Sequence, residues 1–421
     1  VFRAQMPLHV LLFPEMQGRY MQALLAAYHE CGWLPSWSFP SEVGSMIGNH
    51  AIALLADAWI KGIRTFDPAE ALAAYAHESS AKGPWGPANG REGTEEIERL
   101  GYLPYPKYRE ATAKTLDYAY DDFCGYQLAH ATGQSQLEQT FAKRMFNYRN
   151  VYDASTGFMR GRDEHGEWTP NFDPTEWGGP FTEGCAWHWH WSVFHDVAGL
   201  IALMGGDQVF TAKLDSVFTQ PCQFKVGTYG EPIHEMREMV MANMGQFAPG
   251  NQPMQHVVYL YNYAGEPWKS QYWARKVMKQ LYNSAPDGYP GDDDQGQTSA
   301  WYALSALGFY PVCPGTDQYV LGSPLFDKAS ITVRDGKRFT ITANHQSPEN
   351  VYIQSALLNG TPLTRNFLRH EEIANGGSLV FEMGPAPNRV RGTRTEDRPF
   401  SVSTVDQSLG ANTDDAPPAS Q

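Results

Sequence analysis

The sequence has few cysteines, no long apolar run and no excess of basic residues. Its five cysteines lie far apart without a Cys-x-x-Cys pair, which argues against a zinc framework or a disulfide scaffold, although one or two disulfides stay possible. No segment approaches the roughly 18 apolar residues of a membrane-spanning helix, so we expect no membrane span. With 32 basic and 46 acidic residues, the net charge of -14 argues against a nucleic-acid or anionic-membrane partner.

What the sequence does have is length and aromatic side chains. Its 421 residues, 42% of them hydrophobic, suffice for a large core and for two or three domains. The 12 Trp and 22 Tyr fit sugar stacking as well as an ordinary aromatic core. The chain begins at Val1 with no initiator methionine and no signal peptide. We therefore expect a fragment whose N-terminal portion, with any targeting signal, is missing.

Residues 1–313 are predicted to be helical, because apolar residues recur there at helical spacing. The predicted helices are Gln17–His29, Met46–Gly62, Pro68–Ala76, Ala111–Ala131, Ser135–Tyr148, Gly184–Met204, Phe210–Phe218, Pro253–Tyr263, Pro267–Tyr282 and Thr298–Gly308. Several end at glycine, a typical C-terminal stop. Long Gly-, Pro-, Trp- and Asp-rich loops join many of them, and such loops are usually functional. This pattern predicts an α/α toroid with the site at one end; a plain helical array is the alternative.

The pattern changes after Pro314. Short β-prone runs broken by Asp-Gly, Asn-Gly and Gly-Gly predict a small β-sandwich-like domain over residues 314–395. Residues 396–421 are rich in Ser, Thr, Asp and Pro and are predicted to be a disordered tail.

Two acidic motifs are candidates for catalysis. In Gly-Asp-Asp-Asp-Gln-Gly-Gln (291–297), adjacent carboxylates repel one another, and Asp292 and Asp294 point the same way if the loop is extended. The alternative is a solvated acidic turn at a helix N-terminus. In Phe-Thr-Glu-Gly-Cys-Ala-Trp-His-Trp-His-Trp (181–191), Glu183 is expected at a helix start among aromatics. Such surroundings raise the pKa of a carboxyl and suit a general acid, whereas the alternative is a carboxylate that only favours the helix dipole.

Two further motifs carry polar groups without a known metal signature. His234 and Glu235 in Ile-His-Glu-Met-Arg-Glu-Met (233–239) lack the second histidine of a zincin, which disfavours hydrolytic zinc. Asn251 and Gln252 in Gly-Asn-Gln-Pro-Met-Gln-His (250–256) offer the hard oxygen ligands that calcium prefers. An ordinary helix cap at Asn251 is the alternative. With no nucleophile elbow, Walker or dinucleotide motif, this set favours glycoside hydrolysis by two carboxyls.

These residues lie in stretches that closely resemble glycoside hydrolase family 92, the calcium-dependent exo-α-mannosidases. The similar stretches are GWLPSW (32–37), SMIGNHAIALLADAWIKGI (45–63), TGFMRGRDEHGEW (156–168), FTEGCAW (181–187), FHDVAGLIALMGG (194–206), GNQPMQHVVYLYNYAGEPWK (250–269) and PDGYPGDDDQGQTSAWYALSALGFYPVCPGTDQYVLGSPLFDK (286–328). The resemblance covers most of residues 1–330. It implies an (α/α)6 barrel, inverting hydrolysis of terminal α-linked mannose in N-glycans or mannans, a calcium cofactor, and secretion or a periplasmic location.

The resemblance also implies roles for individual residues. Glu183 takes the position of the general acid, and Asp292 and Asp294 match the loop that supplies the base, for which we choose Asp294. His234 and Glu235 match the pair that meets the leaving mannose in α-1,2-specific members. We further assign Asn49, His50 and Trp187 to substrate binding, and Asn251, Gln252 and Asp294 to the metal.

Three features set this chain apart from the family pattern. We expect the family's N-terminal sandwich domain, a partner of this barrel, to precede Val1 in the complete protein, together with a Trp-Asp element just before Val1, so that both lie outside this sequence. Some members carry Gln at the acid position and cleave mannosyl phosphodiesters, whereas this chain has Glu183. Gln252 stands where many members have Glu, which leaves the calcium ligands open. The remaining alternatives are another inverting (α/α)6 hydrolase or phosphorylase and an inactive mannan-binding module.

Overall fold

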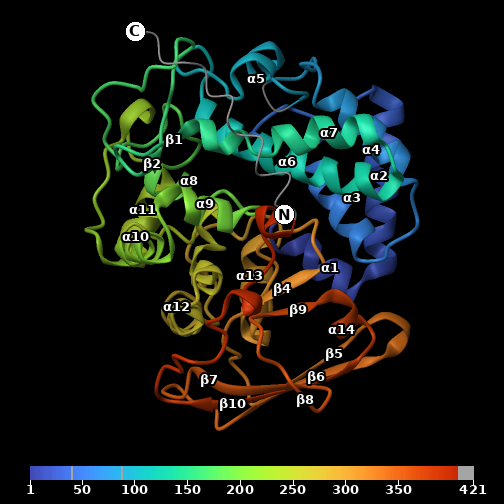
Figure 1. Ribbon diagram of the computed structural model, residues 1–421, viewed down its shortest axis with the longest axis vertical. Helices are drawn as coiled ribbons and strands as arrows, with labels where there is room; N and C mark the ends of the chain where they lie inside the picture. Colours follow the sequence, from blue (N-terminus) through green and yellow to red (C-terminus); the bar gives the residue numbers. More distant parts are fainter. Residues whose placement is uncertain (39–40, 87–88, 406–421) are drawn as a thin grey trace.

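The computed structural model describes residues 1–38, 41–86 and 89–405 (Figure 1). The α-helices are α1 (Gln5–Leu12), α2 (Pro14–Cys31), α3 (Ala51–Ile60), α4 (Pro68–Glu78), α5 (Thr94–Leu100), α6 (Ala111–Thr132), α7 (Ser135–Arg144), α8 (Ala186–Trp189), α9 (Val197–Met204), α10 (Asp207–Thr219), α11 (His234–Ala242), α12 (Pro267–Leu281), α13 (Gln297–Leu307), α14 (His370–Ala374) and α15 (Val402–Val405). The 3-10 helices are η1 (Asn147–Val151), η2 (Gly227–Tyr229), η3 (Gln252–Met254), η4 (Val257–Ala264), η5 (Arg334–Gly336) and η6 (Thr395–Asp397). The strands are β1 (Tyr152–Asp153), β2 (Phe158–Met159), β3 (Phe309–Tyr310), β4 (Gln318–Leu321), β5 (Lys328–Thr332), β6 (Arg338–Asn344), β7 (Tyr352–Leu358), β8 (Thr361–Pro362), β9 (Phe367–Arg369) and β10 (Gly377–Gly384).

Helix α6 runs through the middle of the first helical group and packs against α3, α4, α7 and η1 (Figure 1). It is buried on nearly every side, so its polar residues face protein rather than water. The buried carboxylate of Asp122 is paired with Arg91 and Arg144, each at 2.9 Å. Buried ions need such partners, because an unpaired charge in the interior is costly. α6 therefore combines core packing with a set of charged groups that the neighbouring helices neutralise.

The chain is mainly helical up to β3, as the sequence predicts, but two predicted helices take a different form. The predicted helix Gly184–Met204 is broken into α8 and α9, because Asp196 ends the intervening turn and its side chain caps α9 at Gly199 N (3.2 Å). The predicted helix Pro253–Tyr263 instead falls into two 3-10 helices, η3 and η4, and every residue of η4 is buried. Packing on all sides, rather than one apolar face, shapes this segment.

Two sheets follow the helices. The larger sheet has the strand order β5-β6-β10-β7-β8, and the smaller sheet has the order β3-β4-β9. β10 pairs in parallel with β6, in the register Gly377↔Phe339, and antiparallel with β7. Alternate residues of β6 (Phe339, Ile341 and Ala343) are buried, as expected for a strand with one covered face. The first strand of these two sheets, β3, begins at Phe309, four residues before the predicted end of the barrel at 313.

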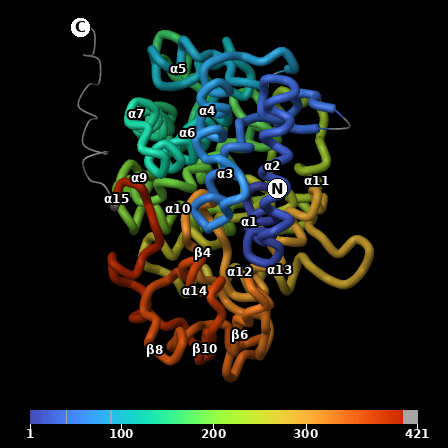
Figure 2. Tube along the Cα trace, turned by 90° about the vertical axis from the view of Figure 1, so that its right-hand side faces the viewer, coloured from blue at the N-terminus to red at the C-terminus, as the bar shows by residue number. Residues whose placement is uncertain are grey.

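The sheets and helices share one hydrophobic core, and Figure 2 shows the strands gathered at one end of the molecule. Helix α12 lies along this junction. Arg275 of α12 donates hydrogen bonds to Pro324 O (2.6 Å) and Gln346 Oε1 (2.8 Å), and Gln271 accepts one from Ile353 N (2.9 Å). The helical and strand regions are therefore held together by polar contacts as well as by packing.

The start of the predicted disordered tail is folded. Val402 is buried, and Ser401 accepts a hydrogen bond from Ala198 N at 2.9 Å. Residues 396–404 thus pack on the helical region, which corrects this part of the prediction; residues 406–421 lie outside the described residues. All five cysteines are free. Within the described ranges, no single helix is long and apolar enough to cross a membrane, and only the bent pair α9–α10 passes that test together.

Candidate active site

A cavity of about 560 Å³ collects most of the predicted site residues. We call it the acidic cavity. Its lining includes His50, Glu183, His234, Glu235, Asn251, Gln252, Asp292 and Asp294, with Val1, Phe2 and Arg3 from the N-terminus and Trp37 and Trp189 among its aromatic residues. These residues come from segments far apart in the sequence. The structure therefore brings residues of all four predicted motifs, two acidic and two polar, to one place.

Glu183 lies in the loop before α8, not at a helix start as predicted, because α8 begins only at Ala186. Its backbone has φ +43°, a left-handed conformation that is unusual for a residue with a side chain. Tyr229 Oη accepts a hydrogen bond from Glu183 N (2.7 Å), and Asn251 Nδ2 donates to Glu183 O (2.9 Å). The same amide lies 3.4 Å from the carboxyl oxygen Oε2. Contacts on both sides thus fix this strained turn and aim the carboxyl into the cavity.

The pKa of Glu183 is raised to about 7, mainly by burial and also by the negative charges of Glu235 and Asp294, while the hydrogen bond from Asn251 acts in the opposite direction. A carboxyl with a pKa near neutrality is protonated in a substantial fraction of molecules at pH 7. It can therefore donate a proton at a pH where an ordinary glutamate cannot.

The three aspartates of the acidic loop (residues 291–297) make different contacts. Asp293 Oδ1 accepts hydrogen bonds from Ser299 N (2.9 Å) and Ser299 Oγ (2.7 Å), so this carboxylate caps the start of α13. Asp292 and Asp294 both line the acidic cavity, as their i, i+2 spacing predicts. Positive φ angles at Asp294 (+52°) and Gln295 (+61°) turn the chain back into the helix. Of the three aspartate side chains, only that of Asp293 serves the helix N-terminus, which was the alternative considered for this motif. Asp292 and Asp294 line the cavity.

His234 and Glu235 begin α11 at the edge of the acidic cavity. His234 Nε2 lies 3.2 Å from Glu235 Oε1, and His234 Nδ1 lies 2.8 Å from Glu238 Oε1. The hydrogen bond with Glu238 is the main reason that the pKa of His234 is raised. Glu238 was not among the predicted site residues. A Cβ at Gly250 or Gly291 would come within 2.7 or 2.5 Å of Glu238 Oε2, so both glycines make room for this carboxylate.

His50 is held by two buried carboxylates of α6. Its Nδ1 lies 2.8 Å from Asp121 Oδ1, and its Nε2 lies 3.4 Å from Asp117 Oδ2. Burial alone would lower the pKa of His50, but Asp121 and Asp117 outweigh it and raise the pKa to about 9. His50 is therefore a cation at neutral pH. Asp117, which also lines the cavity, was missed by the sequence analysis; its only signal is the run of polar residues in a buried helix.

Two predicted substrate-binding residues lie elsewhere, and we correct their assignment. Asn49 is buried: its Nδ2 donates to Gly90 O (2.9 Å) and its backbone N to Asp121 Oδ2 (2.7 Å), so it supports the partner of His50 instead of lining the cavity. Trp187 lines a different cavity and packs edge-on against Phe158, with ring centroids 4.8 Å apart.

The residues proposed for a metal fit calcium by their chemistry. Asn251, Gln252 and Asp294 line the cavity and carry amide and carboxylate oxygens. Asn251 Oδ1 accepts a hydrogen bond from Gln252 N (2.9 Å) and so caps η3, and the Gln252 amide nitrogen contacts Asp294 directly. In the part of the chain that the structure describes, no group of three or more His, Cys, Asp or Glu side chains is placed to hold a metal by itself. A cation here would therefore rely on amide oxygens, backbone carbonyls and water as well as carboxylates, which is the mixture typical of calcium.

The catalytic-domain model of glycosyl hydrolase family 92 matches residues 1–385. The chain belongs to this family. A family 92 inverting mannosidase from Bacteroides thetaiotaomicron is 50% identical, with a TM-score of 0.88 over 95% of this chain and 54% of that chain. A family 92 α-mannosidase from the same organism, whose structure was also solved with mannoimidazole, is 34% identical, with a TM-score of 0.87 over 95% of this chain and 52% of that chain.

A curated relative of this family 92 chain, an uncharacterised secreted glycosidase of Arthroderma benhamiae, is 28% identical over 86% of this chain and 48% of its own length. The chain thus spans about half the length of these relatives. The matches establish the family and the catalytic domain within it.

Proposed function

We propose that the protein is a calcium-dependent exo-α-mannosidase that hydrolyses terminal α-linked mannose, above all α-1,2-linked mannose of N-glycans or mannans, with inversion. One observation carries this proposal: Glu183, with its raised pKa, lines the same cavity as Asp292 and Asp294. Two carboxyls in different ionisation states are what glycoside hydrolysis needs. Family 92 membership, and relatives described as an inverting mannosidase and an α-mannosidase, support the choice of sugar.

In this proposal, Glu183 is the general acid. It donates its proton to the glycosidic oxygen as the bond to the anomeric carbon breaks, so the leaving sugar departs as an alcohol. The Asn251 amide, 3.4 Å from Glu183 Oε2, holds the carboxyl in place without removing its proton. Burial keeps that proton on Glu183 near neutral pH.

Asp294 is the general base, and Asp292 assists it. A water molecule attacks the anomeric carbon from the face opposite the leaving group, and its proton passes to the Asp294 carboxylate. Inverting enzymes need room for this water between acid and base. A cavity of about 560 Å³ has room for a sugar ring and a water molecule.

Calcium would be held by Asn251, Gln252 and Asp294. When bound, it would ligate sugar hydroxyls and favour a ring shape close to the transition state. Its positive charge would also keep nearby carboxylates ionised. The mixed set of amide and carboxylate oxygens described above supports this choice over zinc.

His234 and Glu235 would meet the leaving mannose. They lie at the edge of the acidic cavity, and Glu235 is close enough to raise the pKa of Glu183. Because Glu238 draws the imidazole toward α11, the orientation of His234 is set before substrate arrives. Fixed polar groups at this position can recognise the hydroxyls of a second sugar.

We further propose that the helices close into an (α/α)6 barrel, as the family resemblance implies, with the acidic cavity at one end. The secreted glycosidase relative supports secretion or a periplasmic location. The neighbour solved with mannoimidazole supports a mannose-containing oligosaccharide as the partner.

The test is incubation of the protein with α-1,2-mannobiose and calcium, with and without inorganic phosphate, followed by measurement of released mannose. Release of two mannose molecules without phosphate supports the proposal. Turnover that requires phosphate would make the protein a phosphorylase. Binding without any turnover would make it a mannan-binding module.

A further inference from the structure

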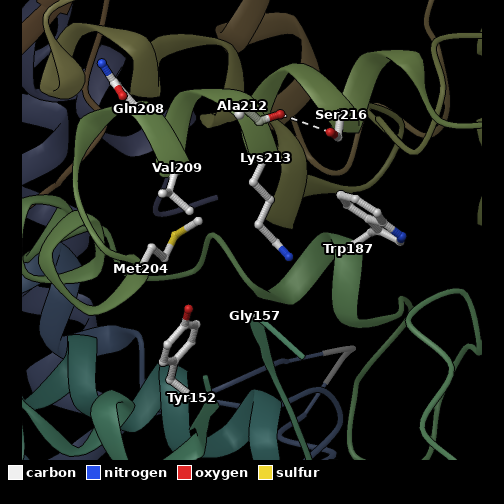
Figure 3. Close-up of a pocket in the computed structure, with 9 residues that line it drawn as sticks. All are labelled: Tyr152, Gly157, Trp187, Met204, Gln208, Val209, Ala212, Lys213 and Ser216. Atoms are coloured by element: carbon white, nitrogen blue, oxygen red, sulfur yellow. Dashed lines mark hydrogen bonds between the residues drawn. The ribbon is translucent and has the colours of Figure 1, made fainter. Parts of the chain in front are cut away.

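A second cavity of about 560 Å³ lies outside the proposed active site, and the two cavities share no lining residue. We call it the lysine cavity (Figure 3). It is lined by Tyr152, Gly157, Trp187, Met204, Gln208, Val209, Ala212, Lys213 and Ser216. The β1–β2 hairpin, α8, the end of α9 and α10 supply these residues. The cavity thus stands on secondary-structure elements rather than on a loose loop.

Lys213 is the charged group of this cavity. Figure 3 shows its side chain reaching from α10 toward Gly157 and Trp187. Its Nζ lies 3.1 Å from the ring centroid of Phe158 and 5.3 Å from that of Trp187. The aromatic faces attract the cation, but they replace only part of the hydration that burial removes.

In the part of the chain that the structure describes, no acidic side chain is paired with Lys213. Among the described residues, none forms an ion pair or hydrogen bond with its ammonium, and no Asp or Glu lines the cavity. Burial lowers the pKa of Lys213 to about 7, with no carboxylate acting against it. This is unusual in a chain with 46 acidic residues and a net charge of -14. An anion entering here would gain a partner and meet no like charge.

The remaining lining suits the body of a small ligand. Met204, Val209 and Ala212 are apolar, and Tyr152 adds a ring with a hydroxyl. Ser216 donates its hydroxyl proton to Ala212 O at 2.9 Å, so it is already satisfied. The Gln208 amide remains as a polar group on an exposed part of α10. Ligand sites usually combine such a mostly apolar lining with a few placed polar groups.

We propose that the lysine cavity binds a small organic anion: a carboxylate or phosphate monoester on a body about the size of one sugar ring. The anionic group would contact Lys213, and the body would lie against Met204, Val209 and Tyr152. This site is separate from the proposed mannosidase cavity, so its existence does not depend on that activity.

The test is calorimetric titration of the protein with mannose 6-phosphate, glucuronate and inorganic phosphate, with methyl α-mannoside as the neutral ligand. We expect at least one of the two sugar anions to bind in the millimolar range or tighter. Lys213→Met should weaken that binding at least tenfold, while Lys213→Arg, which keeps the charge, should retain most of it. The matched control is Lys276→Met, because Lys276 also lies over aromatic rings, with Nζ 4.6 Å from Trp273, but outside the cavity. This variant should bind normally.

The two sugar anions distinguish a phosphate from a carboxylate ligand, and inorganic phosphate shows how much the body contributes. The proposal would be overturned if neither sugar anion bound at 10 mM, or if Lys213→Met bound as tightly as the unmodified protein. It would also fail if Lys213→Arg lost as much binding as Lys213→Met. Circular dichroism of each variant shows that the fold is intact.

Discussion

The two cavities are equal in volume and opposite in charge. Burial raises the pKa of Glu183 in the acidic cavity to about 7, and it lowers the pKa of Lys213 in the lysine cavity to about 7. Desolvation therefore drives both groups toward their neutral forms. The two groups differ in the charges near them: Glu235 and Asp294 lie near Glu183, whereas among the described residues no carboxylate lines the cavity of Lys213. Cavity size alone does not indicate function, but the arrangement of charge around the shifted group does.

The largest expected effect is on Glu183. Glu183→Gln keeps the shape of the side chain but removes the proton, so it should lower turnover of α-1,2-mannobiose by about 10²–10⁴-fold. An aryl mannoside with a good leaving group should lose less, because its departure needs little protonation. Steady-state kinetics on both substrates check this, with Glu164→Gln as a control outside the cavity. Equal losses on the two substrates would argue against the acid role.

Removing the metal should have the next largest effect. Treatment with EDTA should reduce mannobiose hydrolysis at least tenfold, and added calcium, but not zinc, should restore it, because the donors in the acidic cavity are hard oxygens. The lysine cavity contains no such donor set, so anion binding there should survive chelation. Full activity after exhaustive chelation would remove calcium from the mechanism.

Changes at α11 should act more selectively. His234→Ala or Glu235→Ala should weaken hydrolysis of α-1,2-mannobiose about tenfold more than hydrolysis of an aryl mannoside, because the aryl group lacks the hydroxyls that these residues would bind. The ratio of kcat/KM values for the two substrates is the measurement. A uniform loss on both substrates would assign the two residues to support of the fold.

The smallest effects concern stability, and they contrast the two cavities directly. The pKa of Glu183 is raised from its ordinary value of 4.5, so its burial destabilises the fold as the pH rises from about 4.5 to 7 and fully above that. Glu183→Gln should therefore increase the free energy of unfolding by about 1–2 kcal/mol at pH 8 and have little effect at pH 4.

For Lys213 the pH dependence of stability has the opposite sign. Its pKa is lowered from 10.5 to about 7, so the destabilisation is complete below pH 7 and disappears as the pH rises through 10.5. Lys213→Met should stabilise the protein by about 1–2 kcal/mol at pH 6 and less at pH 10. Denaturant unfolding gives the free energy of unfolding of Glu183→Gln at pH 4 and 8, and of Lys213→Met at pH 6 and 10, each beside the unmodified protein. A gain that does not depend on pH would show that the charges are not the cause.

The sequence predicted most of the helices because their apolar spacing is local information. It could not predict the break between α8 and α9, since the apolar pattern continues through His190–Asp196 and only tertiary packing turns the chain there. Likewise, β8 and β9 are only two and three residues long; β8 pairs with the neighbouring strand β7, whereas β9 pairs with the distant strand β4. Short strands have too little pattern of their own to be recognised.

The candidate site, like the fold, could be predicted from the sequence only in part. Glu183, Asp292 and Asp294 could be selected from their motifs and the resemblance, and the structure brings them to one cavity. Asn49 and Trp187 lie in stretches that resemble the family, but such a resemblance does not give the direction of a side chain. Lys213 gave no signal at all, because a lysine on an amphipathic helix is normally solvated. Its significance depends on the rings and the missing carboxylates around it.

The most direct test of the proposed function is ¹H NMR of the first sugar released from α-1,2-mannobiose at neutral pH with calcium. Inversion at an α-linkage produces β-mannose first, which then equilibrates slowly to the α anomer. We expect the β anomeric signal to rise before the α signal. Initial formation of α-mannose would contradict it, because Asp294 would then act as a nucleophile rather than as the base for water.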